Sequence, residues 1–71
     1  MALAANLRAF RERKGWTQTE LAAKVGVAYT RISEIENGAG NPRLSTLDAI
    51  AAALGTSVDR LVRSATNSQK N

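Results

Sequence analysis

The stretch WTQTELAAKVGVAYTRISEIENG, Trp16 to Gly38, decides the fold of this chain. Thr17 and Glu20 have the T-x-x-E spacing of a capping box, which is a strong signal for the start of a helix. Trp16 and Leu21 occupy the two positions of a hydrophobic staple around that box. Apolar residues then recur at helical spacing up to a central glycine, and again beyond it. The stretch therefore predicts two short helices joined by a turn.

The turn is centred on Gly26, which follows Val25, the last apolar residue of the first helix. A sharp turn at this point needs a positive φ angle, which glycine tolerates best. Val27 can then fill the angle between the two helices. Two short helices joined by a glycine-containing turn of about three to four residues are typical of a helix-turn-helix. An αα-corner in a plain helical bundle is the alternative interpretation.

The second helix has two unlike sides. Its apolar residues, Val27, Ala28, Ile32 and Ile35, share one side. The other side carries short hydrogen-bonding groups where a plain solvent-facing helix often holds long charged ones; these residues are Thr30, Ser33, Glu34 and Asn37, flanked by Tyr29 and Arg31. This pattern favours a surface that recognises a ligand.

Helical signals continue on both sides of this stretch. Leu3, Leu7 and Phe10 form one apolar stripe that ends at Gly15, with Arg8, Glu12 and Arg13 facing elsewhere. Ser45 is expected to cap a fourth helix with the stripe Leu47, Ile50, Ala51 and Leu54, and Ser57 to cap a short fifth helix. We predict an all-α bundle of about five short helices over residues 1–63, followed by a disordered polar tail, 64–71.

Composition narrows the classes of function. The 71 residues include no cysteine and no histidine, so the chain lacks thiolate metal ligands and the commonest general base. We expect no enzyme, no cofactor and no small-molecule ligand. The net charge of +4 suits nucleic acid or an anionic membrane surface. No apolar run approaches the roughly 20 residues of a transmembrane helix, and no export signal is visible, so we expect a cytoplasmic protein.

Three segments agree in register with one known pattern: WTQTELAAKVGV, ISEIENG and PRLSTLDAIAAALGTS. Together they resemble the Cro- and C1-type, XRE-like phage repressor family from about Leu7 to Leu61. The resemblance implies a lambda-repressor-like helix-turn-helix fold. It also implies that the helix from Tyr29 to Asn37 is the recognition helix, which lies in the major groove of double-stranded DNA.

The resemblance assigns DNA contacts residue by residue. It implies base contacts for Tyr29, Thr30, Arg31, Ser33 and Glu34, with Ala28 close enough to contact a thymine methyl. Glu34 is a departure, because many relatives have a basic or amide residue there. As an acceptor it suits a cytosine amino group, or it repels phosphate when the register is wrong. The alternative for both Arg31 and Glu34 is an ion pair within the helix.

Phosphate contacts are implied for Gln18, Asn37, Gly38 and Arg43. Gln18 is also expected to brace the start of the recognition helix. Ordinary solvated side chains are the alternative for Gln18 and Arg43.

Relatives link the first and third helices by an ion pair, which implies a structural pair between Arg11 and Glu36. Trp16 could be mistaken for a base-stacking residue, but its staple position predicts a place in the core.

The family often dimerises through the fifth helix. Val58, Leu61 and Val62 are therefore predicted to form a homodimer interface, with sealing of the monomer core as the alternative. The sequence favours a sequence-specific transcriptional regulator that binds a palindromic operator as a dimer. A restriction–modification controller is favoured over a small phage repressor. A competing hypothesis of another class is a protein-interaction module, such as the antitoxin of a toxin–antitoxin pair.

Overall fold

The structure, a computed structural model, describes residues 2–63, in which every regular element is an α-helix. The five helices are α1 (Leu3–Lys14), α2 (Gln18–Val25), α3 (Tyr29–Glu36), α4 (Leu44–Leu54) and α5 (Val58–Val62). The all-α prediction is confirmed, and the predicted tail lies outside the described residues. None of the helices in this part of the chain has the length and apolar character needed to cross a membrane.

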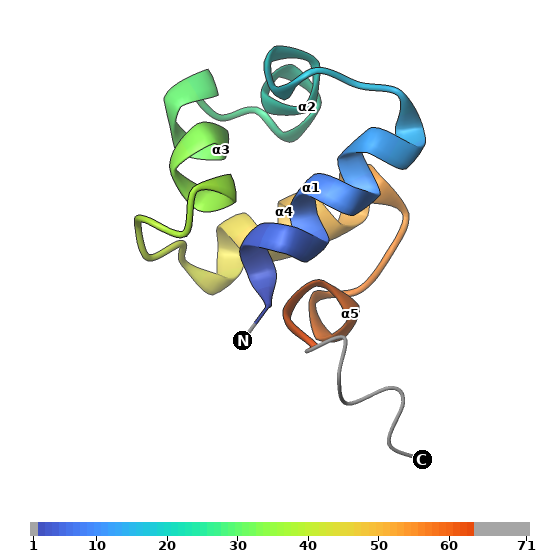
Figure 1. Cartoon of the computed structure of the whole chain (residues 1–71), viewed down its shortest axis with the longest axis vertical. Coiled ribbons are helices and arrows are strands. Elements are labelled where there is room, and N and C mark those ends of the chain that lie inside the picture. Colours follow the sequence, from blue (N-terminus) through green and yellow to red (C-terminus); the bar gives the residue numbers. More distant parts are fainter. Residues whose placement is uncertain (1, 64–71) are drawn as a thin grey trace.

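The helices pack around α1 and α4. Figure 1 shows α1 in front of α4 in the middle of the molecule, with α2 and α3 towards one end and α5 at the other. Helix α1 contacts α3, α4 and α5, while α2 packs against α3 and α4. Every helix thus buries one side against neighbours. This matters because isolated helices of only eight residues, such as α2 and α3, are marginal in water.

The core consists of most of the predicted apolar stripes, although Phe10 and Val27 are only half-buried against it, and Ala28, which precedes the first turn of α3, is exposed rather than on the apolar side. Its buried members are Leu3, Leu7, Leu21, Ala22, Ile32, Ile35, Leu47, Ile50, Ala51, Leu54 and Leu61. The predicted helix ends are confirmed as well, because α1, α2 and α4 each end at a glycine with positive φ, at Gly15, Gly26 and Gly55. Local glycine signals and side-chain periodicity therefore determine most of the architecture.

Two local predictions need correction. The capping residue of α4 is Arg43, not Ser45, and no side chain caps this helix. The buried stripe of α4 begins only at Leu47, so its first turn lies at the surface, where core packing does not set the starting residue. Trp16 is half-buried rather than fully in the core, and it packs against the core from the edge. The Lys24 ammonium nitrogen lies 4.7 Å from the centre of its indole ring.

Candidate nucleic-acid interface

The turn between α2 and α3 fixes how α3 is presented. Gly26 has φ +87° and caps α2 through its N–H, which donates to the carbonyl of Ala22 at 2.8 Å. The Val27 N–H donates to the same carbonyl at 3.1 Å, and its side chain packs half-buried against the core. The capping box at the start of α2 is complete, with hydrogen bonds in both directions between Thr17 and Glu20. Both ends of α2 are thus fixed locally, as predicted.

Helix α3 buries one side and exposes the other. Ile32 has no exposed surface and Ile35 only 3%, so these two side chains anchor α3 in the core. Five of the six predicted base-contacting residues are exposed, and Ser33 is intermediate; the exposed ones are Ala28, Tyr29, Thr30, Arg31 and Glu34. Tyr29 keeps 49% of its surface exposed, although it carries a large aromatic ring. The outward side of α3 is therefore free to contact a ligand.

Glu34 lies beside the loop that follows α3. A Cβ atom placed on Gly40 would lie 3.6 Å from the Glu34 Cβ and 3.9 Å from its Oε1. Arg31, Gly40 and Asn41 line the same shallow polar hollow as Glu34. The alternative of an ion pair within the helix is not realised, because Arg31 and Glu34 do not pair among residues 2–63. Both charges remain open to solvent at this edge of α3.

Two backbone N–H groups after α3 form hydrogen bonds within the chain. The Asn37 and Gly38 N–H groups donate to the carbonyls of Ser33 and Ile35, at 3.0 and 3.1 Å. These two N–H groups terminate α3 and are already hydrogen-bonded. The two residues nevertheless lie at the surface, where other atoms of theirs are exposed. Arg43 is exposed just before α4. The uncapped first turn of α4 adds backbone N–H groups and the positive end of a helix dipole, an arrangement that attracts anions.

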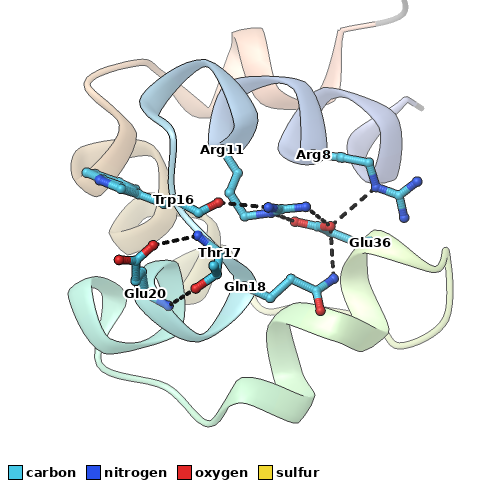
Figure 2. A network of polar contacts seen from close by, with 7 residues as sticks. All are labelled: Arg8, Arg11, Trp16, Thr17, Gln18, Glu20 and Glu36. Atoms are coloured by element: carbon cyan, nitrogen blue, oxygen red, sulfur yellow. Dashed lines mark hydrogen bonds and ion pairs between the residues drawn. The ribbon is translucent and has the colours of Figure 1, made fainter.

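A buried carboxylate joins the three helices around this surface. Glu36, the last residue of α3, has a fully buried side chain that accepts a bidentate pair from Arg11 on α1. The Arg11 Nε lies 2.6 Å from Oε2 and its Nη2 3.0 Å from Oε1. The remaining Arg11 nitrogen donates to the Trp16 carbonyl at 2.8 Å (Figure 2). The predicted pair is present in the structure, and the same Arg11 side chain also hydrogen-bonds to the turn between α1 and α2.

Gln18 joins the same carboxylate. Its Nε2 donates to the Glu36 Oε1 at 3.0 Å (Figure 2). The sequence predicts that Gln18 braces the start of the recognition helix, and this is wrong, because the contact is made at the last residue of α3. The reason is that the first turn of α2 faces the C-terminal end of α3 across the Arg11–Glu36 pair. Whether Gln18 also contacts phosphate stays a prediction.

Electrostatics in this cluster favour the charged forms. Burial alone would raise the pKa of Glu36, but hydrogen bonds from Arg11 and Gln18, together with the Arg11 charge, hold it below its usual value. The hydrogen bond to Glu36 raises the pKa of Arg11, although partial burial opposes the shift. Glu36 is therefore ionised at neutral pH, and the pair holds α1 to the end of the recognition helix.

The predicted dimer residues differ in exposure. Leu61 is fully buried within one chain, so it serves the monomer core and has no surface left for a partner. Val58 and Val62 are half-buried and keep some exposed surface. The end of α5 is tied to α1, because the Asn6 side-chain amide donates to the carbonyls of Leu61 and Arg63, at 2.9 and 2.6 Å. A dimer contact through α5 would thus rest on Val58 and Val62.

A family model described as Helix-turn-helix matches residues 7–61 of this chain. The chain belongs to this helix-turn-helix family. The match spans α2, the Gly26 turn and α3, and it confirms the resemblance to Cro- and C1-type repressors. The family is one of DNA-binding transcription factors and not of enzymes.

The chain is similar in sequence to several curated proteins, among them a hypothetical transcription factor and an antitoxin. A hypothetical transcription factor of Neisseria meningitidis is 43% identical over 60 residues, which cover 84% of this chain and 57% of that protein. Antitoxin HipB of Escherichia coli is 39% identical over 56 residues, covering 79% of this chain and 64% of HipB. The chain spans about half the length of the first curated relatives it matches.

Two solved structures share the fold. The DNA-binding domain of the P22 C2 repressor is 31% identical, with a TM-score of 0.84, over the whole of this chain and 92% of that one. The biofilm regulator SinR of Bacillus subtilis, solved in complex with DNA, is 35% identical with a TM-score of 0.80. That similarity covers 86% of this chain and 98% of the SinR chain. The five-helix lambda-repressor-like fold is thus confirmed.

The sequence does not predict the contacts of two residues of α1 that help to hold the helices together. Arg8, which was expected to face away, reaches Glu36 from one turn before Arg11, with its Nε 3.4 Å from Oε1. Its i, i+3 spacing to Arg11 places both residues on the same side of α1 and could have indicated this. Asn6 caps the last turn of α5 from α1. No local signal reveals that contact, because its partners are backbone carbonyls more than 50 residues away in the chain.

Proposed function

We propose that this chain is a sequence-specific, double-stranded DNA-binding transcriptional regulator that places α3 in the major groove. The observation that carries the proposal is the division of α3 into two sides. Ile32 and Ile35 fix the helix in the core, while the opposite side is open and carries hydrogen-bonding groups. The SinR–DNA complex supports it, since a chain of the same fold binds DNA in that structure.

The proposed contacts fall into two classes. Base contacts come from the exposed side of α3, which consists of Ala28, Tyr29, Thr30, Arg31, Glu34 and, at its margin, Ser33. Phosphate contacts come from Gln18, from the Asn37 side chain, from the loop at Gly38 and from Arg43 with the first turn of α4. Phosphate contacts set the position of the domain, and base contacts select the sequence. The net charge of +4 supports binding to a polyanion.

The finer features of the proposal concern assembly and biological setting. We infer a homodimer that contacts through Val58 and Val62 and binds two inverted half-sites about one helical turn apart, roughly 34 Å. We favour a restriction–modification controller over a small phage repressor as the biological setting, with regulation through the concentration of the protein.

The test is selection from a pool of randomised duplex DNA at physiological salt, followed by sequencing of the bound molecules. Two enriched, inverted half-sites one turn apart would support both the recognition surface and the dimer. A single half-site would retain the DNA function and remove the dimer. Weak, salt-sensitive binding without enrichment would contradict sequence-specific recognition.

An antitoxin is the second candidate function, and the similarity to HipB favours it. It differs from the first in requiring a protein partner. Co-expression of this chain with the product of the adjacent gene would discriminate the two. A stable complex that abolishes toxicity would support the antitoxin, whereas enrichment of an operator without any partner would support a stand-alone regulator.

Replacing Glu34 with alanine should change which base is preferred at one operator position and leave the fold intact. Glu34 is exposed, and its carboxylate can accept a hydrogen bond from a cytosine amino group. The expected loss of discrimination is about 1–3 kcal/mol at that position. Arg43→Ala is the contrasting variant, which should weaken all sequences equally and lower the salt slope by about one.

Both variants are to be compared with the wild type by repeating the selection and by measuring thermal unfolding. Unchanged base preference at every position in the Glu34→Ala variant would show that this carboxylate makes no base contact. Altered preference in Arg43→Ala would remove Arg43 from the phosphate-contacting class.

A further inference from the structure

Arg8 is the one member of the Glu36 cluster that remains largely at the surface. Its side chain is 49% exposed, compared with 12% for Arg11 and none for Glu36. It contacts the carboxylate through Nε alone, at 3.4 Å, which is the longest of the four donor distances in the cluster. Figure 2 shows its two terminal nitrogens turned away from Glu36. Within residues 2–63 these nitrogens form no hydrogen bond.

The charges of the cluster do not balance. The Glu36 carboxylate is already neutralised by Arg11, which binds both of its oxygens. Its Oε1 also accepts a hydrogen bond from Gln18 at 3.0 Å. Two guanidinium groups contact this one carboxylate, and Glu12 acts on Arg11 through its charge without forming an ion pair among residues 2–63, so Arg8 is the cation of the cluster whose charge is least compensated. Because this contact is long, involves Nε alone and leaves the Arg8 side chain half-exposed, we expect it to contribute little to stability, so the cluster does not need Arg8 in order to hold the fold.

The position of Arg8 is adjacent to the proposed DNA-contacting loop. Ala4, one helical turn before Arg8, lines a hollow together with Ile35, Gly38 and Asn41. The first half of α1 therefore flanks the loop that follows α3. Arg8 itself reaches the last residue of α3, which directly precedes Asn37. Its free nitrogens thus lie at the edge of the surface that we assign to phosphate contacts.

We propose that Arg8 contacts a DNA phosphate and that Glu36 positions its guanidinium by accepting from Nε. The two terminal nitrogens form the fork that suits a phosphate oxygen pair. This inference rests on the proposed function, and it extends the DNA-binding surface from α3 and its loop onto α1. Glu36 acts as a positioning residue, because its buried Oε1 accepts hydrogen bonds both from Gln18 on α2 and from Arg8 on α1.

The test compares Arg8→Gln with Arg13→Gln on the duplex obtained by selection. Arg13 is the matched control, since it is an exposed arginine on the same helix, and its guanidinium lies over the Phe10 ring at 5.2 Å. Both variants lose one charge, so any general electrostatic effect is shared. Dissociation constants are measured over a series of KCl concentrations, and thermal unfolding is followed in parallel.

Arg8→Gln should bind more weakly by roughly three- to tenfold for every sequence and lower the salt slope by about 0.9, as expected for one lost phosphate contact. Arg13→Gln should keep the wild-type slope. Arg8→Lys should restore most of the slope, because an ammonium group also neutralises a phosphate. Replacing single phosphates by neutral methylphosphonates should reveal one position per half-site that weakens the wild type and leaves Arg8→Gln unaffected.

Three outcomes would overturn the proposal in distinguishable ways. If the wild type binds its selected duplex and Arg8→Gln behaves like Arg13→Gln in slope and affinity, Arg8 makes no phosphate contact while the proposed function stands. If the wild type shows no salt-dependent binding to duplex DNA, both proposals fail. A loss of binding that is matched by loss of folded protein in Arg8→Gln would assign Arg8 a structural role.

Discussion

Replacing Glu36 with glutamine should lower the free energy of unfolding by roughly 3–5 kcal/mol, the usual effect of removing one partner of a buried ion pair. The change leaves the guanidinium of Arg11, whose side chain is only 12% exposed, without a counter-charge. The free energy of unfolding of a domain is typically about 5–15 kcal/mol, so this loss would be a large fraction of the stability of so small a chain. Urea and thermal unfolding followed by circular dichroism measure the effect.

A second variant keeps the test informative if Glu36→Gln does not fold. Gln18→Ala removes a single hydrogen bond to the same carboxylate and should cost about 1 kcal/mol. Replacing Glu36 and Arg11 together with leucine should be less damaging than Glu36→Gln, because no buried charge is then left unpaired. A Glu36→Gln variant within 1 kcal/mol of the wild type would show that the cluster contributes little to folding.

The same cluster predicts a dependence on pH. The pKa of Glu36 is lower in the folded chain than in the unfolded chain, where it is about 4.3. Its contribution is therefore fully present above that unfolded value and is lost as the pH falls through the lower folded value. Below about pH 4.3 the wild type should lose stability more steeply than Glu36→Gln. Parallel curves for the two proteins would contradict the assignment.

Replacing Arg31 with alanine should weaken binding to the selected operator by roughly ten- to a hundredfold, and base preference at one position should disappear. Arg31 is exposed on α3 and forms no ion pair among residues 2–63, so its guanidinium is available for the two acceptors of a guanine. A good bidentate contact of this kind contributes about 1–3 kcal/mol of discrimination. The variant should unfold at the wild-type temperature.

Arg31→Lys separates a base contact from a phosphate contact. Lysine supplies a charge without the planar fork of arginine, so it can replace a phosphate contact but not a bidentate guanine contact. We expect Arg31→Lys to recover the salt slope and not the base preference. Recovery of both would place Arg31 among the phosphate-contacting residues.

The sequence predicts the fold well where the signals are local. The capping box at Thr17 and Glu20, the turn at Gly26 and the cap at Ser57 each depend on a few neighbouring residues, and each is confirmed. The side of α3 that is exposed follows directly from the periodicity of Ile32 and Ile35. The prediction of Ser45 as a cap failed in a surface turn, where packing imposes no starting residue.

Contacts between distant segments are harder to infer. The helix on which Gln18 lies was predicted correctly, but its partner at the far end of α3 depends on how three helices meet at Glu36. The burial of Leu61 likewise depends on the docking of α5 against α1, which no pattern within α5 reveals. The Arg11–Glu36 pair was accessible only through the family resemblance. The sequence thus predicts elements and faces, whereas tertiary packing determines which polar groups meet.

The division of α3 into a buried and an open side has a consequence for how such proteins diversify. Tyr29 and Thr30 lie on the open side, while Ile32 and Ile35 supply the packing that keeps the helix in place. Exchanging the former pair should therefore retarget the domain to new DNA sites at almost no cost in stability. Duplicated copies of a gene for such a chain could acquire separate operators through a few substitutions, without compensating changes elsewhere in the domain.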